Sequence, residues 1–174
     1  RVPIGRPSMG FTALDGLPMG TRSGGIAPGV IFYLEREKGM TADEVEGFLY
    51  KKSGLLGISR LSSDMRDLEA SDAPGARLAV DYFAYRIVRE TGSLAAALGG
   101  LDALVFTAGI GENSAHVREK VCEGLSWLGV ELDSEANSQN ALVISTGKSR
   151  ARVYAIPTNE ELVIAIKTTK MISA

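Results

Sequence analysis

The sequence predicts an α/β fold in which short strands alternate with amphipathic helices. The continuous apolar run Ala103–Thr107 is typical of a buried strand. A long helical pattern from about Gly75 to Thr91 precedes it, a second helix follows it, and residues 143–145 and 153–156 form two further strand-like runs. The composition agrees, because 45% apolar and 23% charged residues are close to the averages of globular domains.

The first third of the chain combines glycine-rich turns with two helices. Its many glycines indicate tight turns or a close approach of the backbone to another group. Pro28–Lys38 predicts a helix that ends at Gly39. Thr41-Ala-Asp-Glu44 has the pattern of a capping box and predicts a second helix, closed by Gly54.

The remaining elements follow from similar signals. Ser62–Leu68 predicts a short helix capped by serine and aspartate, and Ser93–Leu98 extends or restarts the long helix. After Ser114 a helix is expected with one apolar face, made of Val117, Val121, Leu125 and Leu128. Thr158-Asn-Glu-Glu161 is a second capping box, and we expect its helix to turn three apolar side chains inward: Leu162, Val163 and Ile166.

Charge and composition exclude several classes of function. A net charge of −2 and a pI of about 5.5 argue against nucleic acid or an anionic membrane as a partner. Cys122 is the single cysteine, which excludes internal disulfides and Cys-rich zinc sites, and His116 is the single histidine, which excludes a multi-His metal cage. We expect His116 to be exposed and both Cys122 and Trp127 to pack in the core. The apolar runs are too short to span a bilayer, so a cytoplasmic protein is expected.

The best candidate for ligand binding is the glycine-containing turn Thr107-Ala-Gly-Ile-Gly-Glu-Asn-Ser114. It joins a strand to a helix, where backbone N–H groups can face an anion or the flat edge of a nucleotide. In open α/β sheets, ligands collect at the carboxyl ends of the strands. An ordinary tight connection is the alternative interpretation. The turn lacks the lysine and the hydroxyl residue of a Walker A loop.

Three other groups of residues could carry chemistry. Met19-Gly-Thr-Arg-Ser-Gly24 places Arg22 on a tight loop suited to phosphate or carboxylate recognition, unless it is an ordinary solvated arginine. Asn159-Glu160-Glu161 could hold Mg²⁺ or simply complement the helix dipole. Asp64, Arg66 and Asp67 form a mixed-charge cluster that fits local ion pairing as well as ligand contact.

Taken together, the motifs closely resemble the C-terminal part of the acetokinase family, from Ser8 almost to the end of the chain. That family belongs to the superfamily of sugar kinases, Hsp70 and actin, in which two RNase H-like α/β domains close over a nucleotide. The resemblance implies that residues 1–174 form the C-terminal, nucleotide-binding domain of a two-domain acetate kinase. It rests on six motifs in a fixed order: Ser8-Met-Gly-Phe-Thr-Ala-Leu-Asp-Gly16, Met19-Gly-Thr-Arg-Ser-Gly24, Lys52-Ser-Gly-Leu-Leu-Gly57, Ser63-Asp-Met-Arg-Asp67, Phe106-Thr-Ala-Gly-Ile-Gly-Glu-Asn-Ser114 and Ile156-Pro-Thr-Asn-Glu-Glu-Leu162.

The resemblance also implies a reaction and the roles of particular residues. The reaction is reversible phosphoryl transfer between ATP and acetate, or another short-chain carboxylate such as propionate, with Mg²⁺ as cofactor. Arg22 would stabilise the transferred phosphoryl group, and Glu160 would be a carboxylate of the Mg²⁺ site. The nucleotide would be bound by Asp64, Met65, Arg66, Gly109, Ile110, Gly111, Glu112 and Asn113.

Other residues of such an enzyme are expected outside this chain. The N-terminal half of the family carries the metal-site Asn, the carboxylate-binding Arg, the catalytic Asp and the catalytic His, so we expect this chain alone to be inactive. Inside the match, Arg6-Pro-Ser-Met-Gly10 and Ser23-Gly-Gly-Ile-Ala-Pro28 replace the usual Asp-Thr-Ser-Met-Gly and Ser-Gly-Asp-Ile-Asp-Pro, and Gly25 and Ala27 stand where carboxylates are usual. The alternative is a non-catalytic nucleotide-binding or dimerisation module. A homodimer through this domain is expected in either case.

Overall fold

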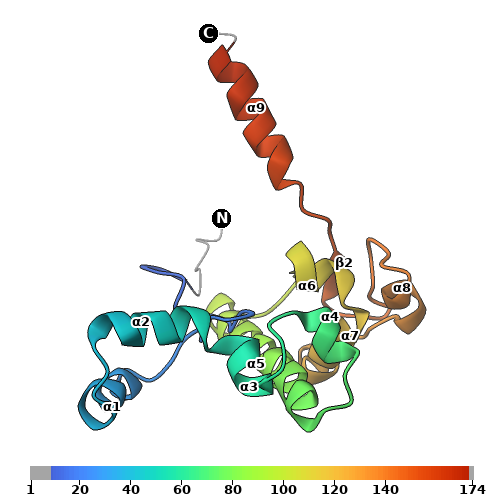
Figure 1. The fold of residues 1–174 in the computed structure, drawn as a ribbon. Helices are drawn as coiled ribbons and strands as arrows, with labels where there is room; N and C mark the ends of the chain where they lie inside the picture. Colours follow the sequence, from blue (N-terminus) through green and yellow to red (C-terminus); the bar gives the residue numbers. More distant parts are fainter. Residues whose placement is uncertain (1–8, 173–174) are drawn as a thin grey trace.

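The structure, a computed structural model, describes residues 9–172, with only the backbone of Glu160, Val163 and Lys170. Helices dominate it, and a small parallel sheet lies in its C-terminal half (Figure 1). The helices are α1 (Gly29–Lys38), α2 (Ala42–Lys51), α3 (Gly54–Ser59), α4 (Met65–Glu69), α5 (Pro74–Leu98), α6 (Ala108–Asn113), α7 (Ala115–Gly124), the 3₁₀-helix η1 (Ser126–Leu128), α8 (Ser134–Ser138) and α9 (Glu160–Ile172). The strands are β1 (Ala103–Phe106) and β2 (Arg152–Ala155).

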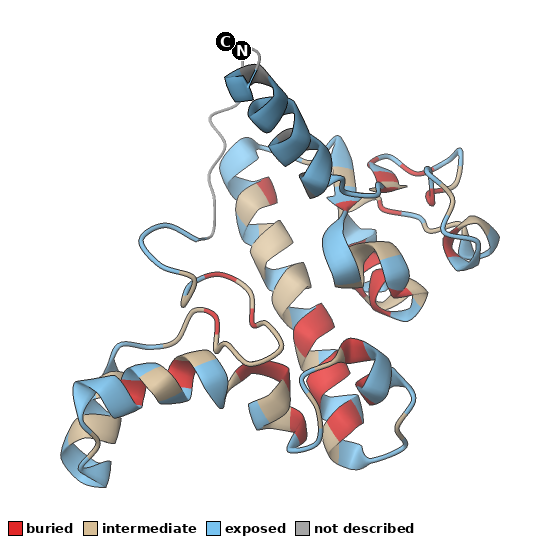
Figure 2. Ribbon diagram, turned by 45° about the horizontal axis from the view of Figure 1, so that its top comes forward, coloured by how far each residue is buried: buried red, intermediate tan, exposed pale blue. Residues whose placement is uncertain are grey.

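The long helix α5 organises the core. It is continuous from Pro74 to Leu98, so Ser93–Leu98 extends it, and it packs against α3, α4 and α7. Figure 2 shows the buried residues of α5 gathered mainly in the half of the helix beside α3 and α4. Around it the core continues with Leu55, Met65, Leu68, Val117, Val121, Cys122 and Leu125. This core joins α4 to α7, the helix that directly follows α6.

The helices α1 and α2 confirm the N-terminal predictions. Gly39 ends α1 in the left-handed conformation at φ 67°, and Thr41 and Glu44 form the capping box of α2. Gly54 was wrongly expected to close α2, because it begins α3 instead. Its φ is 61°, and a Cβ there would lie 2.1 Å from the carbonyl oxygen of Met19, so the position requires glycine.

The sheet is smaller and more exposed than the sequence predicts. β1 and β2 run parallel, with Ala103 opposite Arg152 and Phe106 opposite Ala155. Residues 143–145 make isolated antiparallel bridges rather than a strand of their own. β1 was expected to be buried on both faces, but Val105 is 48% exposed, because no described residue covers that face of the sheet.

The region after β1 confirms some predictions and corrects others. The glycine-containing turn is itself the short helix α6, and Ala108 begins it with a φ of 59°. His116 is exposed in the first turn of α7 and Cys122 is buried, as predicted. Burial raises the pKa of the Cys122 thiol to about 12, so the thiol stays protonated and unreactive. Trp127 is not a core residue: it lies in η1 and is 66% exposed.

The last helix, α9, extends away from the rest of the chain (Figure 1). Leu162 and Ile166 are exposed, contrary to the prediction that they face inward, because no described residue packs on them; the side chain of Val163 lies outside the described part. The start of the helix also differs from the predicted capping box. Asn159 Oδ1 accepts the Leu162 N–H at 3.0 Å, and Thr158 is hydrogen-bonded to Glu112 instead. Among the described residues no helix has the length and apolar character to cross a membrane.

Candidate nucleotide site

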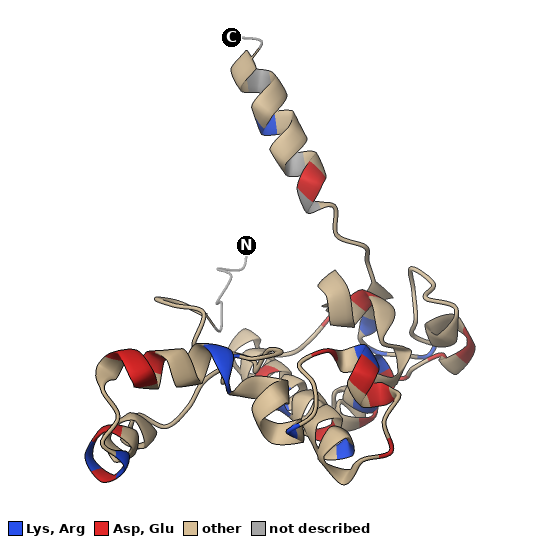
Figure 3. Cartoon of the chain, in the orientation of Figure 1, with Lys and Arg blue, Asp and Glu red and all other residues tan. Residues whose placement is uncertain are grey.

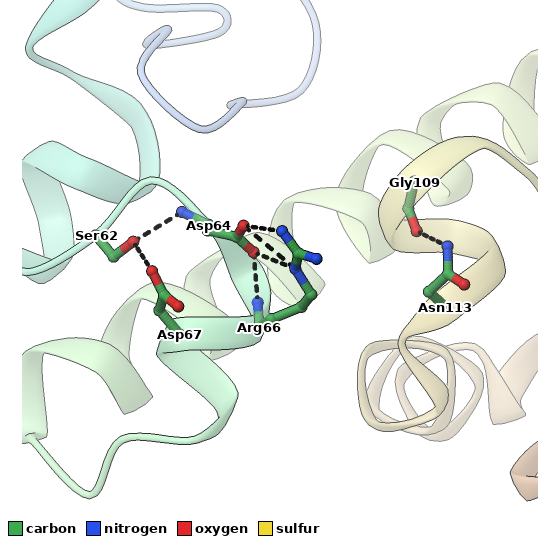
Figure 4. A network of polar contacts seen from close by, with 6 residues as sticks. All are labelled: Ser62, Asp64, Arg66, Asp67, Gly109 and Asn113. Carbon is green, nitrogen blue, oxygen red and sulfur yellow. Dashed lines mark hydrogen bonds and ion pairs between the residues drawn. The ribbon is translucent and has the colours of Figure 1, made fainter.

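Two segments that lie far apart in the sequence line one cavity of about 600 Å³. Such a volume is in the range of small-ligand sites. One wall comes from the start of α4 and the other from α6, and Figure 4 shows Asp64 and Arg66 facing Gly109 and Asn113. The cavity contains six of the eight residues expected to bind nucleotide. Its full lining is Ser63, Asp64, Met65, Arg66, Glu69, Gly109, Ile110, Asn113 and Ser114.

The α4 wall is organised by Asp64, which caps the helix. Its Oδ1 accepts the backbone N–H of Arg66 at 2.9 Å and the side-chain Nε–H at 3.0 Å, and its Oδ2 accepts Nη2–H at 2.5 Å. These bonds, chiefly the one from the Arg66 side chain, lower the pKa of Asp64 to about 2. Arg66 remains 86% exposed. Within the described structure Asp64 engages N–H groups on Nε and Nη2 only, so Arg66 offers further donors to a ligand.

The α6 wall is tied both to itself and to α4. Asn113 Nδ2 donates to the carbonyl oxygen of Gly109 at 2.8 Å. Ser114 Oγ accepts the N–H of Val117 at 3.0 Å, which caps α7, and donates to the carboxylate of Glu69 in α4. The Ser114–Glu69 hydrogen bond therefore joins the two walls of the cavity.

Gly111 and Glu112 do not line the cavity. A Cβ on Gly111 would lie 3.3 Å from the carbonyl carbon of Phe106, so the glycine lets α6 pack on the end of β1. The Glu112 carboxylate accepts the Thr158 N–H at 2.8 Å and the Thr158 hydroxyl, and these bonds lower the pKa of Glu112. Thr158 Oγ1 in turn accepts the N–H of Ala108 at 3.1 Å, which connects α6 to the segment before α9.

Arg118 holds the end of α6 without lining the cavity, and no pattern in the sequence singles it out. Its side chain is fully buried in α7, and its Nη1 donates to the carbonyl oxygens of Gly111 and Glu112 at 3.0 and 2.8 Å. Burial lowers the pKa of the guanidinium. The run Arg118-Glu-Lys120 has the composition of a solvated helix face, so only the structure reveals that its first member is buried.

Arg22 does not line this cavity. Its loop is held to α3 by hydrogen bonds from the N–H groups of Leu55 and Leu56 to the carbonyl oxygens of Met19 and Gly20, at 3.0 and 2.9 Å. The guanidinium carbon lies 5.6 Å from the ring centroid of Tyr50, beside a second cavity of about 470 Å³. The loop adjoins the first cavity, because a Cβ on Gly20 would lie 2.8 Å from the carbonyl oxygen of Ser63.

The two departures from the family pattern and the expected metal-site residue are described only in part. Gly25 lies against the side chains of Asp15 and Arg86, Ala27 is exposed, and Arg6 lies outside the described residues. The side chain of Glu160 also lies outside them. The described side chains contain no group of three or more His, Cys, Asp or Glu that could hold a metal ion.

Acidic and basic residues are interspersed over the body of the described chain, in keeping with its small net charge (Figure 3). The cavity has the same mixed character, because Asp64 and Glu69 share it with Arg66.

Comparisons with known proteins cover nearly all of the chain. The profile of the acetokinase family matches residues 6–166. The acetate kinases of Methylocella silvestris and Rickettsia akari are 60% and 54% identical to it over 165 residues, which are 95% of this chain and 41% and 43% of those proteins.

Solved structures of acetate and propionate kinases are also similar to this chain. The acetate kinase of Porphyromonas gingivalis superposes with a TM-score of 0.88 at 42% identity, over 95% of this chain and 43% of that one. The propionate kinase of Francisella tularensis gives 0.85 at 42% identity, over 91% and 41%. These likenesses confirm the expected α/β fold, and the chain spans about two fifths of the length of the relatives it matches. With its motifs, its fold and 161 of its residues matched by one profile, the chain belongs to the acetokinase family.

Proposed function

We propose that this chain is the nucleotide-binding part of an ATP-dependent acetate kinase. In the whole enzyme the reaction is reversible transfer of the terminal phosphoryl group of ATP to acetate, which gives acetyl phosphate and ADP. The observation that carries the proposal is the cavity between α4 and α6, where residues 64–66 meet Gly109, Ile110 and Asn113 although some forty residues of chain, including all of α5, separate the two segments.

The chemistry of the cavity favours the adenosine part of the nucleotide over its phosphates. Asp64 and Glu69 place two carboxylates in it, which repel phosphate oxygens. Met65 and Ile110 contribute apolar surface for a base, and Asn113 contributes an amide. The phosphates would then extend out of the cavity past Ser63, whose carbonyl oxygen lies against Gly20 in the loop that carries Arg22.

The phosphoryl transfer itself would use Arg22 and groups outside this chain. A guanidinium on a hydrogen-bonded loop suits stabilisation of a transferring phosphoryl group. Mg²⁺ would accompany the phosphates of the nucleotide, and Glu160 remains the carboxylate expected near it. We propose that the binding site for the acyl substrate, acetate or a related short-chain carboxylate, and the remaining catalytic residues lie in the other three fifths of the family's length. This chain alone would then have no kinase activity.

Isothermal titration of the chain with Mg-ATP and Mg-ADP tests the proposal. Gly109 lines the cavity, and a Cβ added there meets no atom within 4 Å, so Gly109→Leu puts a side chain into the ligand's space without a clash. Gly29 at the start of α1 is equally open and lies outside the cavity, which makes Gly29→Leu the matched control. We expect saturable binding by the wild type and Gly29→Leu, and its loss in Gly109→Leu.

An Arg22→Ala variant sharpens the assignment. Arg22 lies beside the second cavity, so its removal is expected to leave most of the affinity for Mg-ADP in place. Absence of saturable binding in a folded wild-type chain, or equal loss in both leucine variants, would contradict the assignment of the cavity.

A non-catalytic dimerisation module is the second candidate, and one observation favours it. α1 buries none of its residues, and Val30, Phe32 and Tyr33 are exposed on it. Apolar side chains of α1 that remain exposed among the described residues fit a contact between two copies of the chain. Sedimentation of the chain without nucleotide measures this property separately from nucleotide binding.

A further inference from the structure

Arg118 is a buried cation whose partners within the described residues are all neutral. Its five N–H groups all have acceptors: Nε–H donates to Asn137 Oδ1 at 2.7 Å, the two on Nη1 to the carbonyl oxygens of Gly111 and Glu112, and the two on Nη2 to the carbonyl oxygen of Asn137 at 2.8 Å and to Asn140 Oδ1 at 2.5 Å. The side chain is 0% exposed. The guanidinium is therefore completely used inside the protein.

Packing alone does not account for an arginine at this position. A buried charge loses its hydration and is tolerated only where hydrogen bonds replace it, and a large apolar side chain would fill the space without that loss. The planar fork does what an apolar side chain cannot: it connects oxygens of two separate segments at defined distances. Those segments are the end of α6 and residues 137–140, which comprise the end of α8 and the turn after it.

The α8 side of this connection is itself held in place by hydrogen bonds. Asn137 is buried in α8, and its Nδ2 donates to the carbonyl oxygen of Ala115 at 2.9 Å, so α8 is tied to the start of α7 as well as to Arg118. Gly111 and Glu112 stand between Ile110 and Asn113, two residues that line the cavity. Any movement of the two carbonyls would move that wall.

We propose that Arg118 is a positioning residue of the nucleotide site, which holds the carbonyl groups of Gly111 and Glu112 and thereby sets the separation of α6 from α4 across the cavity. The part of this inference that concerns the ligand rests on the proposed function. The part that concerns the position of α6 does not, and the two are measured separately.

The test compares Arg118→Lys with Val121→Ala in the whole chain. Lysine keeps the charge, but its single nitrogen cannot bridge α6 and α8 as the fork does. Val121 is fully buried in the same helix and makes none of the hydrogen bonds to α6, so Val121→Ala lowers stability without releasing the carbonyls. Two readouts are used: amide hydrogen exchange of residues 108–114 relative to α5, and the dissociation constant of Mg-ADP.

For Arg118→Lys we expect exchange in residues 108–114 to rise about tenfold over that in α5, and Mg-ADP to bind about tenfold more weakly, as for the loss of a hydrogen bond to a charged group. Val121→Ala is expected to change neither quantity selectively at a comparable loss of thermal stability. If Arg118→Lys does not fold, Asn140→Ala removes one acceptor on the α8 side only, and a smaller selective rise in the exchange of residues 108–114 is expected.

The outcomes distinguish this inference from the proposed function. Equal exchange of residues 108–114 in the lysine and alanine variants would overturn the positioning role. A wild-type chain that does not bind Mg-ADP would overturn the proposed function, while the exchange measurement would still decide what Arg118 does. Unchanged Mg-ADP affinity in Arg118→Lys, with selective exchange present, would overturn the link between the position of α6 and the ligand.

Discussion

The two walls of the cavity each depend on an arginine, and the two arginines are held in opposite ways. Arg66 in the α4 wall is 86% exposed and pairs with Asp64, its neighbour two residues away. Arg118 behind the α6 wall is fully buried, and its partners lie on α6, on α8 and in the turn after α8, up to 22 residues away. One contact is local, charged and solvated, and the other is long-range, neutral on the acceptor side and made by a buried guanidinium.

This difference has a physical consequence for ligand binding. A solvated ion pair contributes little net energy, because water replaces either partner at small cost. Arg66 can therefore exchange Asp64 for a ligand without loss of the fold. A buried guanidinium cannot leave its acceptors without leaving them unsatisfied. The cavity thus combines an adaptable wall with a rigid one, which suits a site that must recognise a ligand against a fixed surface.

The largest effect is expected when each arginine is replaced by leucine. Arg118→Leu leaves oxygens on Gly111, Glu112, Asn137 and Asn140 without their donor, those of Asn137 in a buried position, and we expect it to lower the free energy of unfolding by about 3 kcal/mol or more. Arg66→Leu removes an exposed pair and leaves the capping of α4 by Asp64 to the backbone in place, so no measurable change is expected. Urea unfolding followed by circular dichroism measures both, and equal losses would contradict the distinction between the walls.

A smaller effect is expected where the walls are joined. Ser114→Ala removes the cap of α7 and the hydrogen bond to Glu69, and should cost about 1 kcal/mol of stability. Ser134→Ala is the matched control, because Ser134 is exposed at the start of α8 and Asp133, not Ser134, caps that helix. Thermal unfolding of the two variants should separate them by a few degrees, and coincident curves would mean that the joint between the walls contributes nothing.

The sequence predicted the elements whose signals are local. α1, α2 and α5 follow from caps and helical periodicity, which operate within one or two turns and need no knowledge of the rest of the fold. α3 was missed because six residues are too few to show a period, and its glycine start reads as a helix end. Val105 and α9 were predicted to be buried from their apolar character alone, and burial depends on a partner surface that the sequence pattern does not show.

In the candidate site, too, the sequence predicts the residues in local motifs but not those that act through long-range contacts. Asp64–Arg66 and Gly109–Asn113 stand out as motifs, yet only the structure shows that they share a cavity and that Gly111 and Glu112 turn away from it. Arg118 could not be found from the sequence, because an arginine followed by Glu119 and Lys120 has the composition of a solvated surface. Its role depends on contacts with residues up to 22 positions later in the chain, which no local pattern encodes.

The smallest expected effect concerns the solvated wall alone and depends on pH. The pKa of Asp64 is about 2 in the folded protein, below its ordinary value of 3.8. A carboxyl group with a lowered folded-state pKa stabilises the fold above its unfolded pKa, and this contribution is lost as the pH falls through the folded value. The stability of the wild type should therefore fall with acid more steeply than that of Asp64→Asn between about pH 4 and about pH 2.

Urea unfolding of both proteins across this range measures how the free energy of unfolding changes with pH. The two slopes should coincide above about pH 5, where the Asp64 carboxyl is ionised in the folded and the unfolded state. Parallel curves throughout would show that neither the side chain nor the backbone N–H of Arg66 favours the ionised carboxyl of Asp64 over the neutral one.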